Sequence, residues 1–149
     1  LYNHYITDTV ATFEVEPIDN KVMAQRIATI RSARLPFIVA EDETGQLLGY
    51  AYASPWKARF AYRFTVEITV YLSPVSTGQG LGSALYCALF DELKDLPVNS
   101  VIAGITLPNA ASVALHEKFG MQQVAFFKHV GYKFERWLDT GYWQVQLKT

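Results

Sequence analysis

The sequence has one cysteine, no long apolar run and no block of charge of one sign, and each absence narrows the function. Because Cys87 is the only cysteine, no disulfide can form within the chain, which fits a reducing, cytoplasmic compartment. No apolar run approaches the ~20 residues of a membrane-spanning helix, and no signal-peptide pattern opens the chain. The 13 basic and 14 acidic residues are mixed and give a net charge of −1. We therefore expect neither a membrane nor a nucleic-acid partner.

The three histidines, His4, His116 and His129, lack the spacing of metal ligands, so we expect no metal site. The chain has 149 residues, half of them hydrophobic, which suits one domain with one packed core. We expect a single domain over residues 1–149. The opening LYNHYI is typical of the end of a helix, so we also expect further residues upstream of Leu1.

Apolar periodicity and turn formers predict a mixed α/β protein. The predicted strands Phe37–Asp42 and Leu47–Pro55 flank a turn and should form an antiparallel hairpin. The predicted strands Val66–Leu72 and Ser100–Thr106 are joined through a helix and should be parallel neighbours. We expect a loop or short helix over Trp56–Phe64 and, after Gly120, two strands around a long loop. The predicted helices are Pro17–Ala33, Ser83–Leu96 and Pro108–Gly120, and the predicted strands are Phe37–Asp42, Leu47–Pro55, Val66–Leu72 and Ser100–Thr106.

The stretch STGQGLG, Ser76–Gly82, joins a predicted strand to a predicted helix. The first N–H groups of a helix have no partner within the helix, and glycines let a ligand approach them closely. Three glycines therefore favour a phosphate or pyrophosphate site over a bare tight turn. A P-loop would need Gly-Lys-Ser/Thr, but Ser83 and Ala84 follow the last glycine. The dinucleotide fingerprint also fails, because its glycine spacing and its acidic residue are absent.

With these segments, the sequence resembles the GNAT superfamily of N-acetyltransferases and, more narrowly, its phosphinothricin acetyltransferase-like branch. The resemblance runs along nearly the whole chain. It implies the acyl-CoA N-acyltransferase fold, a central mixed and mostly antiparallel sheet flanked by helices, whose members begin with a further strand that we expect upstream of Leu1. The matching segments are TGQGLG (Thr77–Gly82), ATFE (Ala11–Glu14), PWKAR (Pro55–Arg59), VEITVYLSP (Val66–Pro74), LPNAASVALHEKFG (Leu107–Gly120) and VGYKFERWLD (Val130–Asp139).

The resemblance implies acetyl-CoA as co-substrate, bound through backbone groups at the end of a strand, through the glycine turn and through an asparagine. Asn109 has a second interpretation, because an asparagine before a helix also caps it. The chain departs from the family at Thr77, where glutamine or arginine is usual. The implied cofactor residues are Val70, Tyr71, Leu72, Thr77, Gly78, Gln79, Gly80, Leu81, Gly82, Ser83 and Asn109.

Glu67 stands in an otherwise apolar and β-branched strand, where desolvation raises the pKa of a carboxyl group. From the residues alone, two interpretations stand. Glu67 is a general base, or it is a solvent-facing residue that shares one face of the strand with Thr69 and Tyr71. The resemblance implies the base, because the branch places an acid here that faces the amine, with a bridging water able to relay the proton.

His116 lies seven residues after Asn109, so both should point to one face of a helix. From the residues alone, a surface histidine paired with Glu117 or with a backbone group is the simpler interpretation. The resemblance implies a general acid that protonates the departing thiolate, in place of the tyrosine of the wider family. The reverse assignment stays open, with His116 as the base and Glu67 orienting it.

The segment after Pro55 combines basic and aromatic residues, and from the residues alone it is a surface loop. By the resemblance it borders the acceptor pocket, with Lys57 and Arg59 on one wall and Phe13 and Glu14 on the other. Arg59 would then pair with an anionic group of the acceptor.

Two further expectations concern packing. Cys87 lies among apolar residues of a predicted helix and should be a small buried residue, not a nucleophile. Most of the aromatic residues near the C-terminus should pack inside, with some on the face of a homodimer, which the branch commonly forms. These aromatics are Tyr132, Phe134, Trp137, Tyr142 and Trp143.

The combined prediction is an acetyl-CoA-dependent N-acetyltransferase that transfers directly to a small amino-acid-like amine. The resemblance suggests phosphinothricin, methionine sulfone or methionine sulfoximine, and a polyamine, an antibiotic or a peptide N-terminus stay open. The rival hypothesis is a non-catalytic acyl-CoA-binding or sensing module. Thr77 favours the rival, whereas Glu67 and His116 count against it.

Overall fold

A six-stranded sheet with strand order β1-β2-β3-β4-β6-β5 forms the centre of the molecule. The computed structural model describes residues 1–148. Only β3 and β4 are parallel, and all other neighbours are antiparallel, which confirms the predicted mixed sheet. The strands are β1 (Phe37–Glu41), β2 (Leu47–Pro55), β3 (Thr65–Leu72), β4 (Ser100–Leu107), β5 (Gln122–Lys133) and β6 (Arg136–Gln146).

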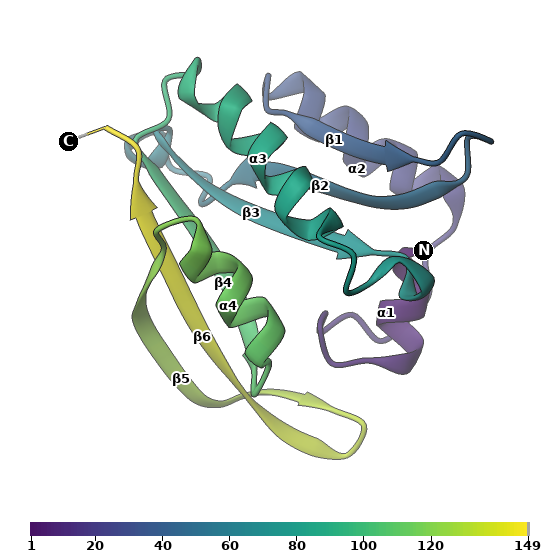
Figure 1. Cartoon of the computed structure of the whole chain (residues 1–149). Coiled ribbons are helices and arrows are strands. Elements are labelled where there is room, and N and C mark those ends of the chain that lie inside the picture. Colours follow the sequence, from purple (N-terminus) through teal and green to yellow (C-terminus); the bar gives the residue numbers. More distant parts are fainter. Residues whose placement is uncertain (149) are drawn as a thin grey trace.

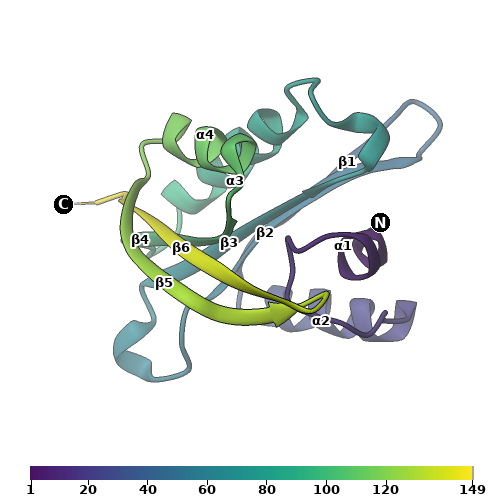
Figure 2. The same cartoon turned by 90° about the horizontal axis from the view of Figure 1, so that it is seen from below.

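Helices cover both faces of this sheet. Figure 2 shows α3 and α4 on one face and α1 and α2 on the other. Asp19 and Asn109 cap α2 and α4, each accepting a hydrogen bond from a backbone N–H of the first turn. No helix in residues 1–148 is long and apolar enough to cross a membrane. The helices are α1 (Tyr2–Asp8), α2 (Asn20–Ser32), α3 (Leu81–Lys94) and α4 (Ala110–Lys118), with short 3-10 turns η1 (Phe60–Tyr62) and η2 (Pro74–Ser76).

The main core lies between α3 and the sheet. Large side chains on one side of α3, such as Leu89 and Leu93, are fully buried against β2, β3 and β4. Ala51 and Ala53 of β2 are fully buried as well, and their small size lets the helix approach the sheet closely. At ~1.5–3 kcal/mol for each large apolar side chain that is removed from water, this face fixes α3 on the sheet.

The parallel pair β3 and β4 is joined over a short length only. Residues Thr65–Glu67 pair with Ser100–Ile102, and beyond Glu67 the register of this pair ends. The later part of β3 continues to pair with β2, and the later part of β4 with β6, so the two strands diverge (Figure 1). The structure therefore opens the centre of the sheet next to the glycine turn that leads into α3.

The C-terminal segment differs from the prediction of two strands around a long loop. A two-residue turn, Phe134–Glu135, joins β5 directly to β6, and both turn residues have positive φ, 53° and 58°. Such a turn matches the twist of a hairpin, but Asn or Gly normally marks it in a sequence. The residues that were expected to form the loop belong to β5 instead, and the register of β5 against β6 shifts between Phe127 and Gly131.

The packing expectations were partly wrong. Trp143 is buried, but Tyr132, Phe134 and Trp137 are 58%, 50% and 61% exposed, because they lie near the tip of the β5–β6 hairpin, outside the main core. Cys87 is exposed, contrary to the expectation. The buried residues of α3 lie at helical spacing around it, which places Cys87 on the outward arc of the helix.

Candidate active site

The glycine turn presents unpaired backbone donors. Gly78 and Gly80 have φ of 75° and 78°, a conformation that favours glycine, and apart from their chain neighbours no atom of residues 1–148 lies within 4 Å of the place where a Cβ would stand. The N–H of Ala84 is the first in α3 to find a partner, the carbonyl of Gly80 at 3.1 Å. Within residues 1–148, the N–H groups from Gly78 to Ser83 donate no hydrogen bond. Together with the positive end of α3 they can hold an anion.

The other residues of this turn bond to backbone carbonyl groups or allow two helices to pack closely. Thr77 donates its hydroxyl to the carbonyl of Pro74 at 3.2 Å, and Gln79 donates its amide to Val75 at 3.4 Å. A Cβ on Gly82 would come within 3.3 Å of Leu115, so this glycine lets α3 and α4 pack closely.

Lys118 of α4 lies beside this turn and was missed from the sequence. Its Nζ donates a hydrogen bond to the hydroxyl of Ser83, 3.1 Å away, which places a cation at the anion-binding end of α3. Because Lys118 is distant in sequence from the glycine motif and follows no pattern of its own, only the packing of α4 against α3 reveals it.

A cleft of about 390 Å³ lies where β3 and β4 diverge, and we call it the gap cleft. Its walls come from the ends of both strands, the glycine turn, α3 and α4. Of the predicted cofactor residues, it includes Val70, Tyr71, Leu72, Thr77, Gly78 and Asn109. The carbonyl of Leu72 already accepts a hydrogen bond from Tyr5 of α1.

His116 lines the gap cleft from α4, on the same side as Asn109, as their spacing predicts. His116 is buried and 4% exposed, so the predicted surface position is wrong, whereas the predicted pairing with a backbone group is confirmed. Its Nδ1 lies 2.6 Å from the carbonyl of Ser112, and its Nε2 lies 2.9 Å from the hydroxyl of Tyr86. A carbonyl only accepts, so Nδ1 carries the proton, and Nε2 accepts the hydrogen bond from Tyr86. Burial lowers the pKa of His116, which favours this neutral form.

Tyr86 is the second residue that the sequence analysis missed. It is fully buried in α3 and packs edge-on against the ring of His116, with ring centroids 5.2 Å apart. Burial raises the pKa of Tyr86 far above its ordinary value, so its hydroxyl keeps its proton. In the sequence this tyrosine looks like one more apolar residue of an amphipathic helix, because its partner lies 30 residues away.

Glu67 lies on the opposite face of the sheet from α3. Its neighbours Val66 and Ile68 pack in the α3 core, so the alternation of β3 turns Glu67, Thr69 and Tyr71 toward the other side. Glu67 is half-buried, and burial raises the pKa of its carboxyl group. Within residues 1–148 it makes no hydrogen bond to His116.

A second cavity, of about 620 Å³, lies between the N-terminal loop and the β5–β6 hairpin, and we call it the hairpin pocket. Glu67 lines this pocket and His116 lines the gap cleft, but the two cavities share wall residues. The residues that line both are Ala11, Tyr71, Gly104 and Thr106. The carboxyl group of Glu67 and the imidazole of His116 thus face adjoining cavities, one on each side of the opening between β3 and β4.

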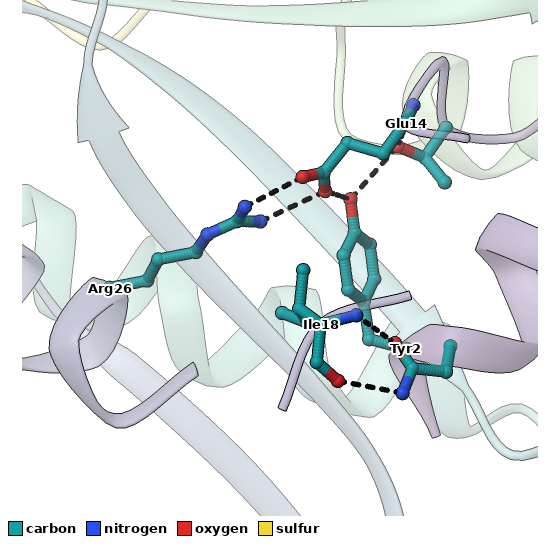
Figure 3. A network of polar contacts seen from close by, with 6 residues as sticks. Tyr2, Glu14, Ile18 and Arg26 are labelled. Atoms are coloured by element: carbon teal, nitrogen blue, oxygen red, sulfur yellow. Dashed lines mark hydrogen bonds and ion pairs between the residues drawn. The ribbon is translucent and has the colours of Figure 1, made fainter. Parts of the chain in front are cut away.

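Of the predicted acceptor residues, the structure brings only Phe13 into the hairpin pocket. Its ring lies against Gly131, where any Cβ would overlap it. Glu14 instead binds Arg26 through two hydrogen bonds of 2.9 and 2.6 Å and accepts another from Tyr2 (Figure 3). The Arg26 guanidinium holds the pKa of Glu14 below its ordinary value.

Lys57 and Arg59 line neither cavity. Their segment reaches the hairpin pocket through Trp56, whose ring packs edge-on against Tyr142, with centroids 5.7 Å apart. Tyr142 is a wall residue of that pocket. The segment therefore adjoins the pocket, as the resemblance implies, but by an aromatic contact and not by the predicted basic side chains.

The N-terminal loop is held from both sides. Tyr2 of α1 lies 2.9 Å from the hydroxyl of Thr12, and Asn3 and Ile18 exchange two hydrogen bonds (Figure 3). From the hairpin, the buried Lys133 donates to the carbonyl of Thr12 at 2.7 Å. These contacts fix one wall of the hairpin pocket.

Comparison with known proteins agrees with this fold and site. A family described as "Acetyltransferase (GNAT) domain" matches residues 2–141. A phosphinothricin N-acetyltransferase of Alcaligenes faecalis is 42% identical over 141 residues, which cover 94% of this chain and 71% of that protein. An L-methionine sulfoximine/L-methionine sulfone acetyltransferase of Salmonella typhimurium is 37% identical over 150 residues, 99% of this chain and 85% of that protein.

Among solved structures, a GNAT superfamily phosphinothricin acetyltransferase from Sinorhizobium meliloti, crystallised in complex with AcCoA, superposes with a TM-score of 0.95. It is 40% identical, and the match covers 99% of this chain and 80% of that chain. The predicted fold and family are thus confirmed. The chain belongs to the GNAT acetyltransferase family.

Proposed function

We propose that this protein transfers the acetyl group of acetyl-CoA directly to the amine of a small amino-acid-like acceptor. Phosphinothricin, methionine sulfone and methionine sulfoximine are the acceptor types that the named relatives suggest. The observation that carries the proposal is the pair of adjoining cavities, one beside the free N–H groups of the glycine turn and one beside Glu67.

Acetyl-CoA fits the gap cleft by the chemistry of its walls. The free N–H groups of Gly78 to Ser83 suit a pyrophosphate, and the ammonium of Lys118 adds a positive charge nearby. Asn109 and the backbone of Val70 and Tyr71 supply polar groups for an amide-bearing arm. The acceptor amine occupies the hairpin pocket, so the two substrates meet at the wall that the cavities share.

In the proposed reaction, the amine nitrogen attacks the acetyl carbonyl carbon, the amide bond forms, and the carbon–sulfur bond breaks. Glu67 accepts the proton of the amine, directly or through a water molecule. The departing thiolate takes a proton from Nε2 of His116, which holds one when a proton from water replaces the hydrogen bond from Tyr86, and His116 then returns to its neutral form. The raised pKa of Glu67 supports its role as the base, and the position of His116 on the wall of the gap cleft supports its role as the acid.

We further propose that the protein is a cytoplasmic homodimer. The exposed aromatics at the tip of the β5–β6 hairpin, Tyr132, Phe134 and Trp137, support a second copy as their cover. The exposed thiol of Cys87 supports a reducing compartment. Sedimentation velocity of the wild type and of Trp137→Ser tests the dimer, which the substitution should weaken. A wild-type monomer at all concentrations would contradict it.

The first test of the function is the release of free thiol from acetyl-CoA over a panel of amines. The panel includes phosphinothricin, methionine sulfone and methionine sulfoximine, with a polyamine and a peptide for contrast. Rapid release with one amino-acid-like amine, and slow release with the polyamine and the peptide, is the expected result. Binding of acetyl-CoA by calorimetry without release with any amine would contradict the proposal and support a sensing module.

A further inference from the structure

Lys133 of β5 is a buried cation that lines neither cavity. The residue is 3% exposed, and within residues 1–148 its ammonium forms no salt bridge with a carboxylate. The ammonium instead donates to two backbone carbonyls, that of Thr12 at 2.7 Å and that of Tyr5 at 3.5 Å. It also lies 5.1 Å from the centroid of the Phe134 ring. Backbone oxygens thus take the place of the water that this charge has lost.

This environment is an unfavourable one for a charge. Burying an ammonium without a carboxylate partner removes its hydration, and neutral carbonyls restore only part of that free energy. The carboxylate of Glu14 attracts the ammonium through space, but Glu14 is itself bonded to Arg26. A methionine of nearly the same length would fill the space without a charge to desolvate. Natural proteins tend to break such packing rules at functional sites, so we looked for what the lysine holds in place.

The lysine holds the N-terminal loop, residues 9–19. Ala11, Thr12 and Phe13 of this loop all line the hairpin pocket, and Ala11 lines the gap cleft as well. Within the described part of the chain, no backbone–backbone hydrogen bond involves residues 10–18. The position of this wall therefore depends on the few side chains that bond to it.

On the hairpin side, two positions of β5 meet the loop. Gly131 receives the ring of Phe13, since any Cβ there would overlap the ring, and Lys133 bonds to the carbonyl of Thr12. Gly131 and Lys133 are two residues apart, so both lie on the same face of the strand. Because Thr12 precedes Phe13, the bond that fixes the Thr12 carbonyl also fixes where the Phe13 ring begins.

We propose that Lys133 is a positioning residue for the acceptor, whose ammonium latches the N-terminal loop to the β5–β6 hairpin and so fixes one wall of the hairpin pocket. It acts through Thr12 and Phe13 and does not touch the acceptor. Without this bond the loop is docked only part of the time, and the apparent affinity for the acceptor falls by that fraction. This inference rests on the proposed function, because it assigns the acceptor to the hairpin pocket.

Lys133→Met tests the proposal, because methionine keeps the length of the side chain but cannot bond to the carbonyls. Lys128→Met is the matched control, since Lys128 is an exposed residue of the same strand. Lys133→Met should raise the KM for the acceptor about tenfold, roughly the worth of one hydrogen bond from a charged group. The kcat and the KM for acetyl-CoA should stay within about twofold, because saturating acceptor draws the loop back into place. Lys128→Met should behave like the wild type.

A purely structural role of Lys133 predicts different kinetics, because loss of folded protein lowers kcat and leaves both KM values unchanged. An unchanged acceptor KM in Lys133→Met would overturn the inference, as would an equal rise in the KM for acetyl-CoA. Should Lys133→Met not fold, Lys133→Gln takes its place in the same comparison. The side chain of glutamine is one bond shorter and does not reach the carbonyl of Thr12.

Hydrogen exchange without substrate gives a readout that does not depend on activity. The N–H groups of Ala11 and Glu14 report on the loop, because they bond to the hydroxyls of Thr9 and Thr12 at 3.1 and 3.3 Å. Both should exchange faster in Lys133→Met than in the wild type and in the control variant, whereas the amides of α3 should keep their rates. Equal exchange in the loop, or faster exchange throughout the protein, would count against the latch.

The two proposals fail in different ways. If the wild type releases no thiol with any amine, the proposed function fails. Calorimetric binding of methionine sulfone in the presence of CoA then still tests Lys133. Weaker binding to Lys133→Met than to the wild type and to Lys128→Met would support the positioning role. Equal binding to all three proteins, or no binding to the wild type, would overturn it.

Discussion

The hydroxyl of Tyr86 lies 2.9 Å from Nε2 of His116, and the carbonyl of Ser112 binds the other ring nitrogen at 2.6 Å. Together these contacts fix the ring orientation, the tautomer and the neutral state of the one buried histidine in residues 1–148. Any proton that His116 exchanges at Nε2 must therefore pass the Tyr86 hydroxyl or displace it. Tyr86 is thus a positioning residue for His116.

Tyr86→Phe should lower kcat about tenfold, because it removes the hydrogen bond that orients His116 and leaves Nε2 unpaired. The KM for acetyl-CoA should change little, since Tyr86 is fully buried and its hydroxyl is already bonded to His116. Steady-state kinetics measures both quantities, and the ¹⁵N chemical shifts of His116 should show a loss of the single Nδ1–H tautomer.

A double-mutant cycle provides the control for Tyr86. If Tyr86 acts through His116, Tyr86→Phe should have almost no further effect in a His116→Ala background. Additive losses in the double variant would show instead that Tyr86 supports the fold or acts by itself, and would contradict the positioning role.

Glu67→Gln should lower kcat by about 100-fold or more, because glutamine keeps the shape of the side chain but cannot accept the amine proton. Acetyl-CoA affinity by calorimetry should stay within about twofold, since Glu67 lines the hairpin pocket and not the gap cleft. Burial raises the pKa of Glu67, so the acidic limb of the wild-type kcat/KM profile should lie above the ordinary carboxylate range.

Glu43→Gln is the matched control, because it makes the same change of charge at an exposed residue of the turn between β1 and β2. It should keep wild-type kcat and the wild-type pH profile. A Glu67→Gln enzyme with full kcat, or with an unchanged acidic limb, would exclude Glu67 as the base.

The pH dependence of stability should report the burial of His116. Burial depresses the pKa of His116 in the folded state, so its contribution is fully present above the unfolded pKa of about 6.5 and is lost as the pH falls through the folded pKa. Urea unfolding of the wild type and of His116→Gln from pH 8 to pH 4 measures this as a difference. A difference in unfolding free energy that stays constant with pH would contradict the depressed pKa.

Thr77→Arg should tighten acetyl-CoA binding by about three- to tenfold at low salt. The substitution restores the long polar side chain that the family usually carries here, and a guanidinium beside the pyrophosphate adds charge-assisted hydrogen bonds. The gain should shrink as salt is added, because Thr77 is exposed. Thr77→Ala, which loses only the bond to Pro74, should bind like the wild type, and an unchanged Kd for Thr77→Arg would place the pyrophosphate elsewhere.

Much of the fold could be predicted because local patterns and tertiary packing agree. The strand Val66–Leu72, the glycine turn and the following helix all occur within two residues of their predicted bounds. The family, the fold, N-acetyl transfer and the use of acetyl-CoA are confirmed by the comparisons. The single-domain assignment, the roles of the site residues and the absence of membrane or nucleic-acid partners stay predictions.

The errors arose where the environment of a residue is decided by distant parts of the chain. Cys87 has apolar neighbours in sequence, but its position on α3 turns it away from the side of the helix that packs on the sheet. The Phe134–Glu135 turn has no glycine or asparagine to mark it, and the tip of the hairpin that it closes lies outside the main core, where Trp137 is exposed. The resemblance implies that Glu14 is on the acceptor wall, but Glu14 pairs with Arg26 of α2, and nothing in the sequence indicates that this arginine reaches it.

The bond from Lys133 to Thr12 joins residues 121 positions apart, and Phe13 packs on Gly131 over a similar separation. Contacts between residues so far apart in sequence form late in folding, because a large loop must lose conformational entropy before the contact can stabilise it. The glycine turn, by contrast, lies in a β3–α3–β4 unit whose contacts are local. During synthesis the part of the gap cleft around the glycine turn should therefore fold first. The acceptor pocket has its second wall only once the C-terminal hairpin has folded back onto the start of the chain, so a half-made enzyme would have no place to bring its two substrates together.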